Sequence, residues 1–181
     1  MRRFFVVAAT LISCGPSKGA NEPRTCNDLG EGFAFHPQGM LAKYDEKVSL
    51  TPPRGFRIDR AIPGKAPVHC ETQLYPCEKE GGGKNVNTAA DVAAALAHPE
   101  VRLALAQNAQ FGEIGNGGNV GGLVDVFSIT HGKERLEIGR PCPTPAGMCR
   151  PVPPPVQHAM DVLMNVYDHH KGLSCSTLPE G

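Results

Sequence analysis

Seven cysteines are the residues whose type and spacing could support the most chemistry in this chain of 181 residues. Zinc sites usually hold paired ligands with two to four residues between them. Here the two closest pairs, Cys70 with Cys77 and Cys142 with Cys149, each have six residues between them. The Cys-x-x-Cys spacing of dithiol redox centres does not occur. The spacing therefore disfavours a metal or redox centre and favours disulfide bonds.

The N-terminal segment has the pattern of an export signal. Arg2 and Arg3 give a positive start, and the uncharged run 4–12 leads to Ser13 and Cys14. A charged start, an apolar run of about 7–15 residues and a small residue before the cut are typical of secretory signal peptides. The run is much shorter than the roughly 20 apolar residues that span a bilayer. We expect residues 1–13 to be removed.

The end of this segment, Leu11-Ile12-Ser13-Cys14, resembles the lipobox of bacterial lipoproteins at each of its four positions. The resemblance covers the signal segment alone. It implies cleavage before Cys14 and attachment of lipid to the Cys14 thiol, and two or more acyl chains hold a protein stably at a membrane. The alternative is an ordinary secretory signal followed by a cysteine. Gly15, in place of an Asp, favours the outer over the inner membrane.

The six cysteines left after lipidation, Cys26, Cys70, Cys77, Cys142, Cys149 and Cys175, predict a disulfide framework. Export brings thiols to an oxidising compartment, and six is an even number. Fifteen pairings are open. We favour the two local pairs, Cys70–Cys77 and Cys142–Cys149, because both intervals contain Pro, and this leaves Cys26 with Cys175.

Histidine and carboxylate side chains give a weaker chemical signal. His158 and Asp161 lie one turn apart in a predicted helix and could share a metal ion with His169, but a solvated helix face explains them better, and no His-Glu-x-x-His occurs. Neither Gly-x-Ser-x-Gly nor Ser-x-x-Lys is present. The glycine-rich stretch 115–122 lacks the Lys-Ser/Thr ending of a P-loop and is interpreted as a loop, with a ligand-covering loop as the alternative. We therefore predict no metal and no cofactor.

The elements that must position these residues form an α+β domain. Residues 47–50, 56–59, 68–75, 111–114, 123–130 and 134–139 have strand patterns, and a turn at 131–133 predicts a β-hairpin, within a meander, from the last two. Thr88 and Asp91 resemble a capping box at the start of a helical stretch, 88–109, which Pro99 divides into two short helices.

The C-terminal amphipathic helix is the clearest element, predicted over 154–170. One face is apolar, formed by Val156, Ala159, Met160, Leu163, Val166 and Tyr167. His169, His170 and Lys171 fall in its last turn, where positive charge suits the helix dipole. Gly172 is a suitable C-terminal cap.

Length and composition favour one small disulfide-stapled domain, residues 26–181, on a flexible tether, residues 14–25. The glycine run 80–84 could divide this domain, but either part alone is small for a core. The whole chain has 18 basic and 18 acidic residues. Removing Arg2 and Arg3 leaves a slight negative charge, which gives no case for a nucleic-acid partner.

Three functions fit these observations. We expect a cell-envelope lipoprotein, anchored to the membrane by lipid, whose domain is a non-catalytic module that binds an envelope protein or a glycan. Exposed aromatics on a concave surface, such as Phe33, Phe35 and Tyr44, would favour it. The alternative is an envelope hydrolase, which a pocket joining His131, His158 or His169 to carboxylates would favour. The third function is a periplasmic inhibitor or assembly factor that presents the loop 143–148.

Overall fold

The computed structural model describes residues 28–37, 45–76, 86–113, 126–141, 150–172 and 176–177. Within these ranges it is an α+β structure, as the sequence predicts. The elements in chain order are β1 Phe33–His36, β2 Asp45–Thr51, β3 Gly55–Ala61, β4 Val68–Gln73, α1 Ala89–Ala97, α2 Pro99–Ala106, β5 Gln110–Glu113, β6 Phe127–His131, β7 Glu134–Pro141, α3 Pro154–His170 and β8 Ser176–Thr177.

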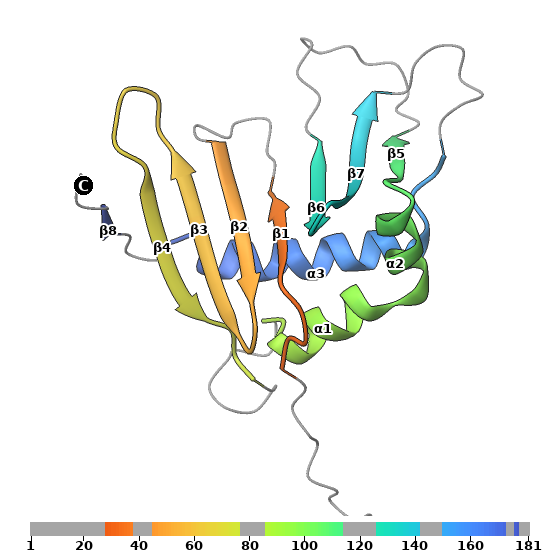
Figure 1. Cartoon of the computed structure of the whole chain (residues 1–181), viewed down its shortest axis with the longest axis horizontal. Coiled ribbons are helices and arrows are strands. Elements are labelled where there is room, and N and C mark those ends of the chain that lie inside the picture. The colour runs from red at the N-terminus through yellow and green to blue at the C-terminus, as the bar shows by residue number, and fades with distance from the viewer. Residues whose placement is uncertain are drawn as a thin grey trace, which may run out of the picture.

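The strands form one mixed sheet in the order β5-β7-β6-β1-β2-β3-β4-β8 (Figure 1). Each neighbouring pair is antiparallel except β5 and β7, which are parallel. The predicted hairpin is present as β6 and β7, which turn at Gly132 with a φ of +60°. Strand β1 has no counterpart in the sequence analysis, yet it lies between β2 and β6 and joins the two halves of the sheet.

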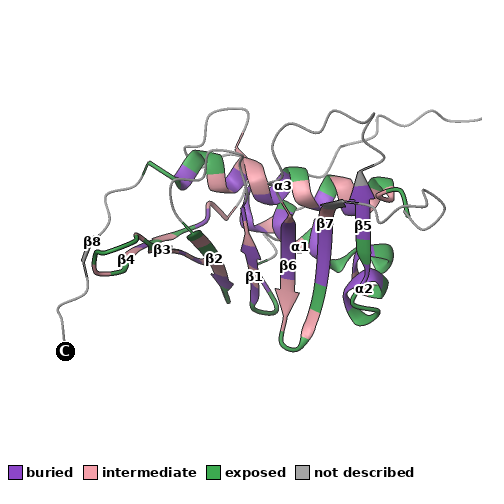
Figure 2. Cartoon of the chain, turned by 90° about the horizontal axis from the view of Figure 1, so that it is seen from above, coloured by how far each residue is buried: buried purple, intermediate pink, exposed green. Residues whose placement is uncertain are grey.

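The three helices cover one face of this sheet, and α3 runs across the strands (Figure 1). Alternation along the central parts of the strands sends apolar side chains toward the helices, and the opposite face of the sheet is called the helix-free face. In β3, for example, Phe56 and Ile58 are buried, whereas the alternate residues Arg57 and Asp59 are half-buried. Figure 2 shows that burial is greatest in the central strands and that β4 is largely exposed or half-exposed.

Helices α1 and α2 confirm the predicted break at Pro99. Thr88 Oγ1 accepts a hydrogen bond from Asp91 N, and the Asp91 carboxylate accepts one from Thr88 N, which completes the capping box. Pro99 occupies the first turn of α2, where its missing N–H costs no helical hydrogen bond. The side chain of His98 caps α2 by accepting a hydrogen bond from Glu100 N.

Helix α3 has the predicted bounds, but its last turn differs from the prediction. His170 was expected to supply positive charge that suits the helix dipole, whereas its side chain is 5% exposed and packs against Phe56, with the ring centroids 4.9 Å apart. The expectation was wrong because residue 170 falls on the buried side of the helix together with Val166. The positive group at this helix end is Arg60, whose Nη2 donates to the Lys171 carbonyl oxygen.

The predicted display of aromatic residues is also wrong. Phe33 and Phe35 are 8% and 0% exposed, because both face the helices and belong to the core. Tyr44 lies outside the described residues, as do the glycine-rich stretch 115–122, the run 80–84 and the loop 143–148. Of the seven cysteines, Cys70 alone is described; the others are Cys14, Cys26, Cys77, Cys142, Cys149 and Cys175.

Candidate functional site

The helix-free face carries a continuous row of polar and small residues. Strand register places one residue from each of six neighbouring strands side by side in the order Arg135, Thr130, Ala34, Ser49, Arg57 and Glu71. The two central residues, Ala34 and Ser49, are small, and long charged side chains stand at both ends. The backbone ladder of six strands fixes the spacing of these six residues.

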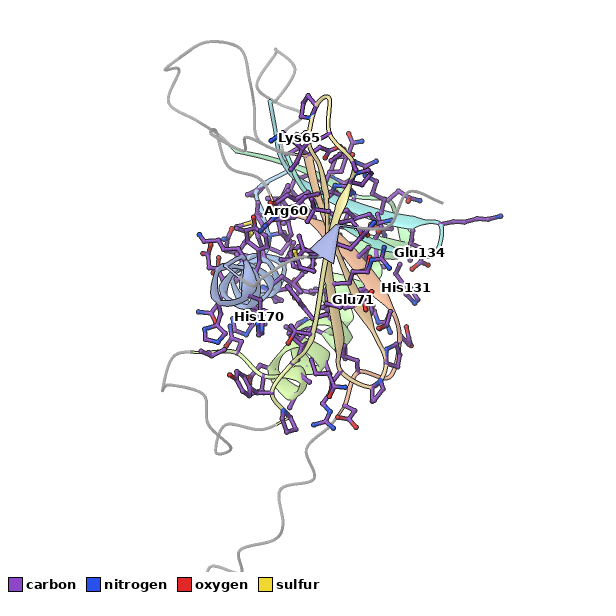
Figure 3. The ribbon with its side chains drawn as sticks, turned by 90° about the vertical axis from the view of Figure 1, so that its left-hand side faces the viewer. Arg60, Lys65, Glu71, His131, Glu134 and His170 are labelled. Carbon is purple, nitrogen blue, oxygen red and sulfur yellow. The ribbon has the colours of Figure 1, made fainter. Side chains whose placement is uncertain are left out.

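Four charged or titratable side chains gather at one end of this row, on β3 and β4. We call Arg57, Asp59, His69 and Glu71 the β3–β4 cluster. Arg57 Nε donates to Asp59 Oδ1 at 2.6 Å and Arg57 Nη1 to Glu71 Oε1 at 3.2 Å. His69 Nδ1 also contacts Asp59 Oδ1, and it lies 2.7 Å from Arg57 Nη2. Figure 3 shows Glu71 on the side of the sheet away from His170 and α3.

The cluster is built around the charge of Asp59. Burial raises the pKa of this carboxyl, but the hydrogen bonds from Arg57 and His69 outweigh burial and hold the pKa below its usual value. The hydrogen bond to Asp59 in turn raises the pKa of Arg57. Asp59 is therefore an ionised acceptor at neutral pH that fixes two neighbouring side chains.

The contact with Asp59 also defines what His69 can do. Where Nδ1 donates to the Asp59 carboxylate, the lone pair lies on Nε2, whereas the Arg57 guanidinium, which can only donate, favours the opposite tautomer. Among the described residues, none forms a hydrogen bond with His69 Nε2. An imidazole oriented in this way has the arrangement of a general base.

A second cluster surrounds His131 at the turn between β6 and β7. His131 Nε2 lies 2.9 Å from Glu31 Oε2, and its Nδ1 lies 3.4 Å from Glu134 Oε2. Arg102 Nη2 from α2 donates to the same Glu31 oxygen at 2.7 Å. Phe33 stacks on the His131 ring with the centroids 4.8 Å apart, and the Arg102 guanidinium lies 5.2 Å from the Phe33 centroid.

The His131 cluster meets one condition that the sequence analysis set for a hydrolase, since His131 converges with carboxylates. Both of its ring nitrogens face a carboxylate, however, so neither is free to accept a substrate proton. The hydrogen bond from Arg102 is the main cause that lowers the pKa of Glu31. This geometry is suited to joining Glu31, just before β1, to α2 and the β6–β7 turn.

The other predicted histidines do not converge. His158 is exposed, and Asp161 accepts a hydrogen bond from Gln157 Nε2 at 2.9 Å. His169 lies near Tyr75 and His170, with ring centroids 6.0 and 4.9 Å away. Within the described ranges, no group of three or more His, Cys, Asp or Glu side chains has a geometry that could hold a metal ion.

Sequence reasoning did not identify Arg57 and Asp59. The alternation in the predicted strand 68–75 sets His69 and Glu71 apart from Val68 and Cys70, and the same alternation in 56–59 sets Arg57 and Asp59 apart from Phe56 and Ile58. The missing information was the pairing of β3 with β4, which aligns Arg57 with Glu71 and Asp59 with His69. If Pro63-Gly64-Lys65 had been interpreted as the turn of a β-hairpin, the pairing of β3 with β4 would have been predicted.

The chain matches no family model, and no curated protein or solved structure is similar enough to be recognised as a relative. In the part of the chain that the structure describes, no helix combines the length and apolar character needed to cross a membrane. Function therefore has to be inferred from the residues and their geometry.

Proposed function

We propose that this chain is a cell-envelope lipoprotein whose α+β domain binds a partner protein through its helix-free face. Residues 1–13 direct export, lipid on Cys14 anchors the chain, and residues 14–25 separate the domain from the membrane. Gly15 favours the outer membrane. The lipobox-like residues 11–14 support this location in the cell envelope. The domain, residues 26–181, is stabilised by three disulfides among its six cysteines.

The observation that carries the binding role is the six-residue row from Arg135 to Glu71. A binding surface needs side chains held by a rigid scaffold, and these six stand on neighbouring strands. Charges of both signs at the ends of the row suit a protein surface of complementary charge, because such patterns provide specificity and orient the partner. A glycan is the other ligand that the sequence allows.

The binding role can be tested by site-specific photo-crosslinking in the living host. A benzoylphenylalanine in place of Ser49, at the centre of the row, is expected to yield one discrete protein adduct. The same group in place of Ala94, an exposed residue of α1, serves as the matched control. Arg57→Glu should abolish the Ser49 adduct. Equal adducts from both positions, or an adduct insensitive to Arg57→Glu, would contradict the proposal.

The anchor can be tested with a matched pair of variants. Cys14→Ala removes the lipid acceptor, so the chain should lose palmitate labelling and should no longer be processed at residue 14. Ser13→Ala keeps a small residue before the cysteine, and its labelling should equal that of the wild type. Unchanged labelling of Cys14→Ala would show that the anchor lies elsewhere or does not exist.

A second candidate, an envelope hydrolase, is favoured by one specific arrangement. Asp59, His69 and Ser176 occupy directly opposed register positions on three neighbouring strands, β3, β4 and β8. Asp59 orients His69, and a serine stands at the next position along. In such a triad the histidine takes the serine proton as the oxygen attacks an ester carbonyl. It then protonates the leaving alcohol, and water releases the acid.

A fluorophosphonate probe distinguishes the two candidates. A hydrolase predicts covalent labelling at Ser176 that His69→Gln abolishes. Ser49→Ala and His36→Gln change a serine and a histidine elsewhere on the sheet, and they should leave labelling unchanged. Absence of label on the folded wild type would remove the hydrolase and leave the binding role.

A further inference from the structure

Cys70 lies inside the core of the domain. It is 2% exposed, stands opposite Ile58 on β3, and is disulfide-bonded. The described ranges contain no second cysteine, so its partner is one of the remaining five cysteines of the domain. The identity of that partner follows from the strand register.

Strand β8 pairs antiparallel with β4, and the described pairs are Val68 with Thr177 and His69 with Ser176. In an antiparallel ladder, one step forward on one strand matches one step back on the other. Cys70 follows His69 in the sequence, and Cys175 precedes Ser176. We propose that Cys70 and Cys175 form a disulfide that fixes the C-terminal strand to β4.

The geometry of the ladder suits this bond. Directly opposed residues in antiparallel strands have Cα atoms about 4.5–5.5 Å apart and side chains on the same face. Disulfides need Cα atoms about 4.4–6.8 Å apart. The bond needs no rearrangement of β4, and it accounts for a pairing as short as β8, which comprises Ser176–Thr177.

The local partner that the sequence analysis favours, Cys77, fits less well. The β3–β4 ladder continues beyond Gln73, because Leu74 N donates to Arg54 O at 2.8 Å. Leu74 is therefore about 13 Å from Cys70 along the strand. Residues 75–77 would have to double straight back, whereas the Tyr75 carbonyl accepts a hydrogen bond from Ala89 N at the start of α1.

The other cysteines are farther away. Cys142 follows Pro141 on β7, five strand positions from β4, which corresponds to about 24 Å. Cys26 precedes Leu29, whose N donates to Pro53 O at the far end of β3. That end is about 16 Å from the level of Ile58, and the three residue steps from Leu29 back to Cys26 span at most about 11 Å. Cys26 would reach Cys70 only as a fully extended chain.

Formation of the bond consumes an oxidant. Two thiols and one disulfide of an envelope thiol oxidase give the Cys70–Cys175 bond and two thiols on the oxidase, with two electrons and two protons transferred. The pairing therefore rests on the proposed export, because a reducing compartment would not supply this disulfide donor.

Peptide mapping of the native chain tests the pairing directly. The protein is taken from the membrane fraction of its host, free thiols are blocked with N-ethylmaleimide, and the unreduced chain is digested with trypsin and a glutamate-specific protease. Cleavage after Lys65, Glu71, Glu78, Lys171 and Glu180 separates residues 66–71, 72–78 and 172–180. The expected product is 66–71 linked to 172–180, which reduction splits into two.

Each outcome decides one question. A link from 66–71 to 72–78 or to 25–31 overturns the pairing and leaves the lipoprotein proposal intact, as does a free Cys70 in a chain with acylated Cys14. The expected link in a chain without acyl groups supports the pairing and counts against the anchor. As a second measurement, Cys70 of Cys175→Ser should react with N-ethylmaleimide once the chain is unfolded in denaturant without reductant, whereas Cys70 of Cys149→Ser should not.

Discussion

At the scale of single residues, His170 shows how burial changes the role of a side chain. Its ring packs against Phe56 and lies 6.4 Å from that of Tyr75, and among the described residues its buried Nε2 has no hydrogen-bond partner. Burial, followed by the neighbouring His169, lowers the pKa of His170 below 6.5. The folded protein therefore holds this imidazole neutral where the unfolded chain would begin to protonate it.

This pKa shift predicts a loss of stability in acid. Below the unfolded pKa of about 6.5 the unfolded state binds more protons than the folded state, so the free energy of unfolding falls as the pH drops toward the folded value. His170→Leu removes this group with little change in volume, so stability at pH 8 should change by less than about 1.5 kcal/mol. Urea unfolding between pH 8 and pH 5 should show a shallower pH dependence for His170→Leu.

The matched control for His170 is His158, an exposed histidine on the same helix. His158→Gln should unfold with the pH dependence of the wild type, because folding does not bury this exposed side chain. If His158→Gln flattens the profile and His170→Leu does not, burial of His170 is not the source of the acid sensitivity.

At the scale of elements, the C-terminal end of α3 is joined to the sheet by a buried polar group. The Tyr167 hydroxyl donates to Glu46 Oε2 on β2, and Arg60 Nε on β3 donates to Glu46 Oε1 at 2.5 Å. The Glu46 side chain is 9% exposed. Burial, followed by the hydrogen bond to Glu46, raises the pKa of Tyr167, which keeps the phenol protonated and able to donate.

Removal of the Tyr167 hydroxyl should weaken this connection. Tyr167→Phe leaves a buried carboxylate oxygen without its donor, at an expected cost of about 1–3 kcal/mol in unfolding free energy. Tyr75→Phe is the control, because no hydrogen bond of its hydroxyl is recorded among the described residues. Urea denaturation of both variants measures the difference. Equal losses of unfolding free energy in the two variants would show that the hydrogen bond from Tyr167 to Glu46 does not stabilise the fold.

The capping box of α1 makes a separate prediction. Thr88→Ala should lower stability by about 1 kcal/mol, because Asp91 N loses its acceptor at the start of the helix. Thr88 and Asp91 act as one unit, so the double variant with Asp91→Ala should lose less than the sum of the two single changes. Strict additivity in this double-mutant cycle would contradict the reciprocal bonds.

The elements differ in how well the sequence predicted them, for physical reasons. Helix α3 was predicted with its observed bounds, because seventeen residues give several turns of apolar periodicity and prolines mark its start. Strand β1 was missed because four residues, Phe33–His36, give two alternations and no turn signal. Its two phenylalanines were named as candidate exposed aromatics for the same reason. Its place in the sheet comes from pairing with β2 and β6.

At the scale of the whole molecule, the candidate site depends on contacts that local patterns do not encode. The predicted strand 68–75 contains His69 and Glu71 at alternating positions, but their association with Asp59 and Arg57 requires the β3–β4 register. Ser176 lies next to His69 only because β8 pairs with β4, and the two residues are more than a hundred positions apart in the chain. Sequence patterns therefore predicted the faces of the elements, whereas tertiary pairing determines which side chains meet.

The shared sheet leads to a prediction about cooperativity. Helix α2 covers β6 and β7, whereas β2 to β4 lie at the other end, and β1 pairs with both halves. Leu105 on α2 is 0% exposed and Leu50 on β2 is 1% exposed. Leu105→Ala and Leu50→Ala should each cost about 2–5 kcal/mol. If the halves unfold as one unit, each change should shift a single transition in which far-UV circular dichroism and tyrosine fluorescence coincide.

Tyr75 and Tyr167 lie at the end of the sheet that contains β2 to β4, so their fluorescence reports on the unfolding of that end. If the two halves were independent, Leu105→Ala would shift only part of the circular dichroism transition and would leave the tyrosine signal in place. That outcome would divide the chain into two subdomains, as the glycine run at 80–84 would allow. A coincident shift in both signals would instead show that β1, through its two neighbours, transmits the loss of packing under α2 to the opposite end of the sheet.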